Sequence, residues 1–124
     1  MSGGAGVLPP RARRWLEAWH GGDPAVVAAL YATDGTHESA KVAVSMPELG
    51  RMMLRGRVEI EEYARRAFAR VGRLRFEVTH VVEDSRGCAV EYVRTTAVDP
   101  APTRVLEMME WDGGRMTACR VYHF

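Results

Sequence analysis

Four segments in the second half of the chain carry the pattern that most restricts its fold. They are rich in β-branched and aromatic residues, and short sequences of Gly, Pro, Asp and Ser separate them. The segments are residues 73–84, 88–98, 103–111 and 115–124. Turns this short join neighbouring strands that run in opposite directions. The pattern therefore predicts a four-stranded antiparallel meander.

Three helices are predicted before the meander. Residues 12–20 carry an apolar stripe at helical spacing, and two glycines follow them. Asp23 can cap a second helix, which has Pro24 at its first position and is expected to end near residue 32. A third helix is expected over residues 56–71, with an apolar face and an acidic first turn. Helices followed by a meander indicate an α+β fold, in which a curved sheet packs against helices.

The segment between the second and third helices is predicted less uniquely. After a turn at Asp34-Gly35, residues 36–40 are typical of a short strand. Residues 41–55 hold too many Met and Leu side chains for a solvated loop. Two interpretations remain open: the segment packs at the edge of the core, or it forms a mobile cover over a cavity.

The composition is that of an ordinary globular domain. The chain has 124 residues, of which 47% are hydrophobic and 27% charged, and its net charge is +1. A nucleic-acid-binding domain usually has a marked basic excess, so no nucleic-acid partner is expected. The chain has no run of 18 apolar residues and no signal-peptide pattern at its start, so no membrane partner and a cytoplasmic location are expected. Residues 1–10 are interpreted as a flexible tail, and residues 11–124 as one domain.

Two further groups of residues are interpreted conservatively. Cys88 and Cys119 lie on predicted strands without the spacing of a metal site, so we expect reduced thiols and no metal. Five arginines cluster around the end of the third helix, at positions 65, 66, 70, 73 and 75. They indicate a solvated helix face more than an anion site.

The order of elements, together with three sequence stretches, resembles a known family. The stretches are GGDPAVVAALYATDGTHES, GRVEIEEYARRAF and EWDGGRMTACRVYHF. They resemble the SnoaL-like branch of the nuclear transport factor 2-like fold, which includes polyketide cyclases, ketosteroid isomerases and limonene epoxide hydrolases. The resemblance covers residues 11–124. It implies a cone-shaped α+β barrel with three N-terminal helices on a curved antiparallel sheet, and an apolar pocket that works without a cofactor.

The resemblance also implies positions for functional residues. The proton-shuttling aspartate of ketosteroid isomerase falls on Ser39, and its substrate-binding phenol falls on Trp15. Neither residue keeps the original chemistry, because a serine hydroxyl is no base near neutral pH and an indole only donates a hydrogen bond. The protonated acid of that enzyme falls on Glu107, which does keep its chemistry. An aspartate that activates water in the epoxide hydrolases falls on Val121, and Glu91 falls on the face that lines the pocket in relatives.

The register of the last hairpin decides which face Glu107 occupies. Val105, Met109 and Trp111 share its strand face. A two-residue loop, Gly113-Gly114, would place Arg120 opposite Glu107 and make a surface ion pair. A three-residue loop, Asp112 to Gly114, would instead place Cys119 opposite Glu107 on an inner face. A slip of one residue exchanges the two faces, and the resemblance favours the three-residue loop.

Three residues are candidates for catalysis. Burial would raise the pKa of an inward-facing Glu107, so that its protonated carboxyl could donate a hydrogen bond to a developing oxyanion. His37 or Glu91 would then be the base. The plainer interpretation is that Glu107 is simply buried and hydrogen-bonded to Trp15, Tyr63 or His123. The residues expected to line the pocket are Trp15, Ser39, Tyr63, Val93, Met109, Cys119, Val121 and His123.

Two kinds of function remain open. The first is a cofactor-free enzyme that isomerises, cyclises or hydrolyses a small hydrophobic organic molecule. The second is a non-catalytic module for ligand binding or assembly. Four apolar residues expected on the other sheet face predict a homodimer interface, because a monomer rarely exposes such a patch. They are Tyr92, Leu106, Met108 and Tyr122.

Overall fold

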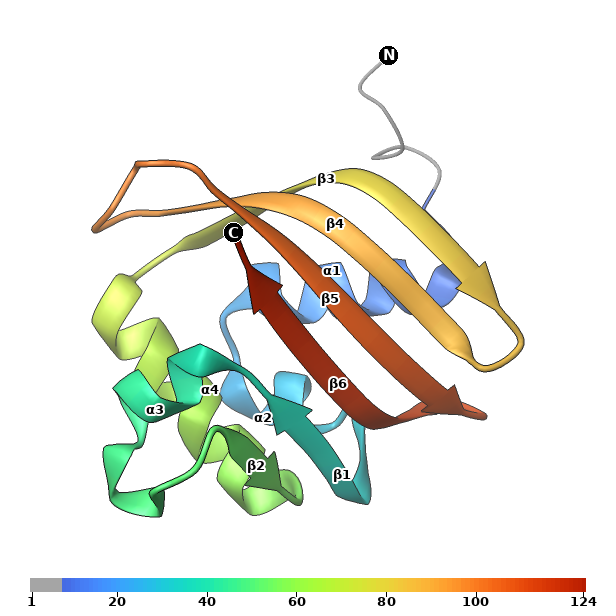
Figure 1. Ribbon diagram of the computed structural model, residues 1–124, viewed down its shortest axis with the longest axis horizontal. Helices are drawn as coiled ribbons and strands as arrows, with labels where there is room; N and C mark the ends of the chain where they lie inside the picture. The colour runs from blue at the N-terminus through green and yellow to red at the C-terminus, as the bar shows by residue number, and fades with distance from the viewer. Residues whose placement is uncertain (1–7) are drawn as a thin grey trace.

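The computed structural model describes residues 8–124, which form a six-stranded sheet with helices on its inner face (Figure 1). The helices are α1 (Pro10–Gly21), α2 (Pro24–Ala28), α3 (Ala40–Ser45), the 3₁₀ helix η2 (Pro47–Leu49) and α4 (Arg57–Val71). The strands are β1 (Tyr31–Glu38), β2 (Met53–Arg55), β3 (Leu74–Asp84), β4 (Gly87–Thr96), β5 (Thr103–Asp112) and β6 (Arg115–His123). The expected tail over residues 1–10 lies mostly outside the described part. Of the tail residues that the structure describes, Leu8 is buried and Pro10 begins α1.

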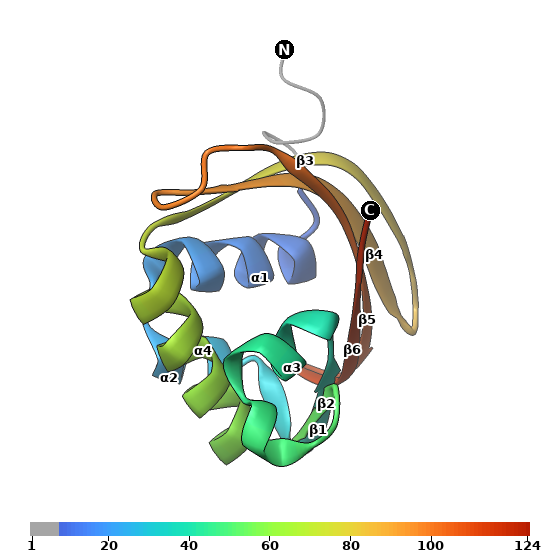
Figure 2. The same cartoon turned by 60° about the vertical axis from the view of Figure 1, so that its left-hand side comes forward.

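The strand order is β2-β1-β6-β5-β4-β3, and the sheet curves around the helices without closing (Figure 2). The meander β3 to β6 is antiparallel, as the sequence predicts. Strand β1 pairs in parallel with β6, and β2 extends the sheet antiparallel to β1. Helix α1 packs against β3 and β4, and α4 packs against α2, β1 and β2. The α+β fold with a cone-like interior is therefore present. No helix within residues 8–124 is long and apolar enough to cross a membrane.

Strand β1 begins earlier than the sequence indicates. Helix α2 ends at Ala28 instead of near residue 32, and β1 runs from Tyr31 through the expected turn at Asp34-Gly35. A Cβ atom on Gly35 would lie 2.9 Å from the carbonyl oxygen of Met116 on β6. The glycine thus permits close approach of two backbones, at a place where the β1–β6 register shifts.

The segment over residues 41–55 packs at the edge of the core. It folds into most of α3, followed by η2 and β2, and its apolar residues Val42, Met46 and Leu54 are buried. The hydroxyl of Ser39 caps α3 by accepting a hydrogen bond from the backbone N–H of Lys41 at 3.1 Å. Of the two interpretations left open, the structure supports the first.

The β5–β6 hairpin has a register that neither sequence alternative predicted. The turn is the two-residue Gly113-Gly114, with Asp112 opposite Arg115. Thr117 then bulges from β6 and shifts the register, so that Glu107 pairs with Val121 instead of Arg120 or Cys119. The predicted partners are therefore wrong. Glu107 nevertheless faces inward, as the three-residue loop implied. The reason is that the bulge at Thr117 also adds one residue to β6.

Candidate functional site

The centre of the candidate site is the carboxyl group of Glu107. Its side chain is only 3% exposed and lies on the inner face of β5. It accepts hydrogen bonds from the Trp15 indole at 3.0 Å, the Tyr92 hydroxyl at 2.6 Å and the Cys119 thiol at 3.2 Å. These donors come from α1, β4 and β6. One buried acid therefore connects the first helix to three adjacent strands.

Burial dominates the electrostatics of this carboxyl. Removal from water raises the pKa of Glu107, while the hydrogen bonds from Tyr92, Cys119 and Trp15 lower it, and the net direction is upward. None of the basic side chains in residues 8–124 forms an ion pair with it. An indole can only donate a hydrogen bond, so the proton of the neutral acid cannot be accepted by Trp15. In its protonated form the carboxyl can donate to Tyr92, to Cys119 or into the adjoining cavity.

A small cavity adjoins Glu107 inside the cone. Its volume is about 50 Å³. A water molecule in the liquid takes about 30 Å³, so this space suits one or two waters or the end of a small organic molecule. Six of the residues predicted from the sequence line it, namely His37, Ser39, Tyr63, Glu107, Val121 and His123.

His37 contributes a neutral imidazole to the cavity wall. The residue is buried on β1, and its Nδ1 lies 2.7 Å from the hydroxyl oxygen of Tyr31. Burial, with a smaller contribution from His123, lowers the pKa of His37 to about 4. At neutral pH the ring is therefore uncharged. In the tautomer that carries its proton on Nδ1 and donates to Tyr31, the lone pair of Nε2 is free to accept a proton.

Two phenols and one thiol near Glu107 and His37 are held in their neutral forms. Burial, reinforced by the nearby Glu107 carboxyl, raises the pKa of Tyr63 to about 12. Burial is also the largest cause that raises the pKa of Tyr92 and of Cys119, again with help from Glu107. These groups can donate or accept hydrogen bonds at neutral pH, but they are not nucleophilic anions.

The structure places five predicted site residues away from the cavity wall. Trp15 and Cys119 lie behind Glu107 and hold its carboxyl, while Met109 is buried elsewhere in the core. The placement of Glu91 and Val93 on the pocket face is wrong. Strand β4 pairs with β5 so that Val90 and Tyr92 face inward, which turns Glu91 and Val93 to the outer face of the sheet.

Glu91 has other partners on that outer face. Its carboxylate accepts hydrogen bonds from Thr79 at 2.7 Å and lies 2.8 Å from Nδ1 of His80. Tyr92, predicted on the outer face as part of a dimer interface, is instead buried and bonded to Glu107. Both errors have one physical cause. Strand β4 has apolar residues on both faces, so alternation alone could not identify the inner one.

The cavity is also lined by residues that the sequence did not assign to it. Phe76 and Tyr92 pack with tilted rings, 4.4 Å between ring centroids, and form an aromatic wall. Lys41, Arg70 and Arg94 complete the lining with positive charges. If the inner face of β4 had been assigned from the large aromatic side chain of Tyr92, strand alternation would also have placed Arg94, two residues further along, on that face.

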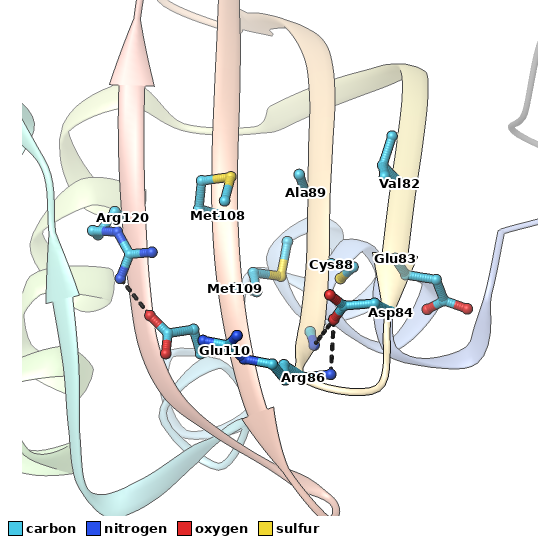
Figure 3. Close-up of a pocket in the computed structure, with 11 residues that line it drawn as sticks. Val82, Glu83, Asp84, Arg86, Cys88, Ala89, Met108, Met109, Glu110 and Arg120 are labelled. Carbon is cyan, nitrogen blue, oxygen red and sulfur yellow. Dashed lines mark hydrogen bonds and ion pairs between the residues drawn. The ribbon is translucent and has the colours of Figure 1, made fainter.

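A larger hollow lies on the outer face of the sheet, but its acidic groups already have partners. It measures about 270 Å³, and Val82, Ala89, Met108 and Arg120 lie across it (Figure 3). Glu110 pairs with Arg120 at 2.6 Å, and Asp84 accepts hydrogen bonds from the backbone of Arg86 and Gly87 (Figure 3). Among residues 8–124 no group of three His, Cys, Asp or Glu side chains is placed to hold a metal ion. The acid–base candidates therefore belong to the inner cavity.

Comparison with known proteins supports the family assignment. The model of the SnoaL-like domain family matches residues 12–123. No curated protein matches the chain. A Catenulispora acidiphila protein with a ketosteroid isomerase-like fold, solved with trimethylamine, has a TM-score of 0.75 at 20% identity, over 94% of this chain and 86% of its own.

Two other solved structures share the fold at low identity. A SnoaL-like protein of unknown function from Burkholderia thailandensis has a TM-score of 0.74 at 21% identity, over 91% of each chain. A Sinorhizobium meliloti protein provisionally identified as a polyketide cyclase has a TM-score of 0.75 at 15% identity, over 93% of this chain and 95% of its own. At such identities the similarity establishes the fold alone.

The buried imidazole predicts a pH-dependent stability. The pKa of His37 is about 4 in the folded protein and 6.5 ordinarily, so between these values the unfolded chain binds more protons. Stability from this residue is therefore lost as the pH falls from about 6.5 to about 4. Urea unfolding measures the free energy of unfolding at each pH. Between pH 7 and pH 5 this free energy should fall by about 2 kcal/mol less in His37→Gln than in the unmodified protein.

The matched control is His80→Gln, which removes a histidine whose side chain is 77% exposed. The pH-dependent loss of stability in His37→Gln should differ from that of the unmodified protein by more than the loss in His80→Gln does. An equal loss in His37→Gln and the unmodified protein would contradict a buried neutral His37.

Proposed function

Because the chain belongs to the SnoaL-like domain family, we propose that it is an enzyme that performs acid–base chemistry on a small oxygen-bearing organic molecule. The reaction is an isomerisation, cyclisation or hydrolysis that requires proton transfer to or from the substrate. One observation carries the proposal. Glu107 is a buried acid with a raised pKa, and it lines the same small cavity as the neutral His37.

The two residues have complementary roles. The protonated carboxyl of Glu107 donates a hydrogen bond to a substrate oxygen and stabilises the negative charge that develops there. Nε2 of His37 removes a proton from the adjacent carbon. Trp15, Tyr92 and Cys119 are positioning residues, because their hydrogen bonds fix the carboxyl group of Glu107.

Ser39 has a structural role in this proposal. Its hydroxyl oxygen accepts a hydrogen bond from the N–H of Lys41 as the N-cap of α3, so it is not available as a base. The base moves to His37, two residues earlier on β1, whose side chain points to the same face of the strand. The acid position of the ketosteroid isomerases is thus retained, while the base is a different residue type.

The size of the cavity favours a second function, which is ligand binding without catalysis. A volume of about 50 Å³ admits only a few heavy atoms beside Glu107. In a binding protein, the buried acid would only recognise an oxygen or nitrogen of the ligand. The two functions differ in whether a carbon-bound proton is exchanged.

Proton exchange from a small ketone tests the enzymatic function directly. The protein should accelerate deuterium incorporation next to the carbonyl group of butanone in D₂O, followed by proton NMR. Glu107→Gln should reduce this rate by roughly 10²–10⁴-fold, because a positioned acid contributes about that factor. The variant can remain folded, since its amide oxygen can accept from Trp15 and its NH₂ group can donate to Tyr92.

The matched control is Glu110→Gln, on the same strand but on the outer face, where it pairs with Arg120. That variant should keep the full rate. Exchange that the protein does not accelerate, or that is equal in Glu107→Gln and the unmodified protein, would exclude the enzymatic function and leave the binding function.

We further propose that the protein forms a homodimer through the outer sheet face, defined by Val82, Ala89, Leu106, Met108, Arg120 and Tyr122. Val82 is 71% exposed and Tyr122 is 47% exposed, which is unusual for large apolar residues on one face of a sheet. The same face carries acidic Glu110 and basic Arg120. A face with apolar and mixed-charge groups is complementary to a second copy of itself across a two-fold axis.

Sedimentation equilibrium should give twice the chain mass of 13.8 kDa at micromolar concentration. Met108→Glu should give the monomer mass, because it places a charge in the centre of the interface. Val58→Glu, at an 86% exposed position on α4, should remain dimeric. A monomer mass for the unmodified protein would refute the interface.

A further inference from the structure

Three cationic side chains from separate elements converge on the inner cavity. Lys41 comes from α3, Arg70 from the end of α4, and Arg94 from β4. These segments are far apart in the sequence, so the fold alone brings the charges together. The sequence had indicated a solvated arginine cluster around Arg70 and an apolar ligand. Arg70 is exposed, as that interpretation expects, and it also lines the cavity that holds Glu107, Lys41 and Arg94.

None of these three cations has an acidic partner within residues 8–124, a feature that they share with several arginines outside the cavity. Within residues 8–124, ion pairs with Glu are made by Arg11, Arg51, Arg65, Arg66 and Arg120. Lys41, Arg70 and Arg94 make none. Arg70 donates a hydrogen bond to the Ser45 hydroxyl. Asp99 is the acid whose charge reaches Lys41, and its Oδ1 already accepts from the N–H of Ala101 at 3.1 Å.

Two hydrogen-bond donors of the cavity lining are buried without a partner. They are Nε of Arg94 and Nε1 of Trp19. A buried donor without an acceptor is costly, and native proteins rarely keep one without a reason. A guanidinium with a free edge is well suited to a planar carboxylate, which accepts two parallel N–H donors.

The cations also repel one another and the nearby imidazole. Burial lowers the pKa of Lys41, and the charges of Arg94 and Arg70 lower it further. Burial, then Arg94 and Lys41, lowers the pKa of His123 to about 4. A negative charge bound among these groups would relieve this repulsion. A positive charge would increase it, which distinguishes this cavity from one suited to an ammonium ligand.

We propose that the ligand of this cavity is a small organic carboxylate. Its carboxylate group binds Arg94, Lys41 and Arg70, and its short carbon chain extends toward Glu107 and His37. The assignment names the substrate class of the proposed enzyme and rests on the proposed function only for what happens after binding. It also reconciles the small cavity with an organic ligand, because only the uncharged end has to enter the space of about 50 Å³.

Binding of a matched pair of probes tests the proposal without any turnover. Butanoate and butanamide have nearly the same shape and differ in charge. The three indole N–H signals in ¹⁵N NMR report binding: Trp19 lines the cavity, Trp15 is bonded to Glu107, and Trp111 serves as the remote reference. Butanoate should shift the first two signals and bind at least about tenfold more tightly than butanamide, with an affinity that falls as NaCl is added.

Arg94→Gln and Lys41→Gln should each weaken butanoate binding about tenfold and leave butanamide binding unchanged. Arg75→Gln removes one exposed charge outside the cavity and should change neither. A native pattern of three indole signals shows that a variant is folded. If Arg94→Gln does not fold, the binding measurements on Lys41→Gln test the proposal. Equal affinity for the two probes, or an equal effect of Arg75→Gln, would overturn the proposal.

The outcome is separable from that of the proposed acid–base chemistry. Glu107→Gln keeps all three cations, so it should still bind butanoate in preference to butanamide even where it loses proton exchange. A protein that binds both probes equally but exchanges protons would retain the enzymatic function and lose only the carboxylate assignment.

Discussion

The site depends on one buried carboxyl group and the three donors that hold it. Glu107 has no basic partner within residues 8–124, so its position rests on hydrogen bonds from Trp15, Tyr92 and Cys119. Each buried donor left without this acceptor would cost about 1–3 kcal/mol. The same contacts join α1 to β4, β5 and β6, so the acid is a structural link and, in the proposed function, also the reactive group. Burial favours its neutral form and the donors favour its anion, which is how a fold can tune an acid toward neutral pH.

The rest of the cavity is consistent with this central group. His37 is uncharged because it is buried, and it forms no ion pair with the other residues of 8–124. The three unpaired cations, Lys41, Arg70 and Arg94, lie among the lining residues and would attract a negatively charged ligand. In the proposed function, an acid, a neutral base and a group of cations in one small space would define both the orientation of a ligand and the place of its reactive atoms.

Much of the fold could be predicted from the sequence, because its helices and meander carry strong periodic patterns. The inward face of Glu107 could be weighed but not settled, since it depends on a bulge at Thr117 that has no sequence signal. Glu91 was assigned to the wrong face for a related reason: Val90 and Tyr92 on one side of β4 look no more buried than Ala89 and Val93 on the other. Arg70 could not be separated from Arg65 and Arg66 by sequence, although only the latter two are paired with Glu62.

The protonation state of Glu107 is the claim on which the account most depends. The ¹³C chemical shift of its side-chain carboxyl carbon, followed against pH, measures it in the folded protein. The account predicts a midpoint above the ordinary value of 4.5, and a still higher midpoint in Tyr92→Phe, which lacks one hydrogen bond to the anion. A midpoint at or below 4.5, or one that Tyr92→Phe leaves unchanged, would contradict it.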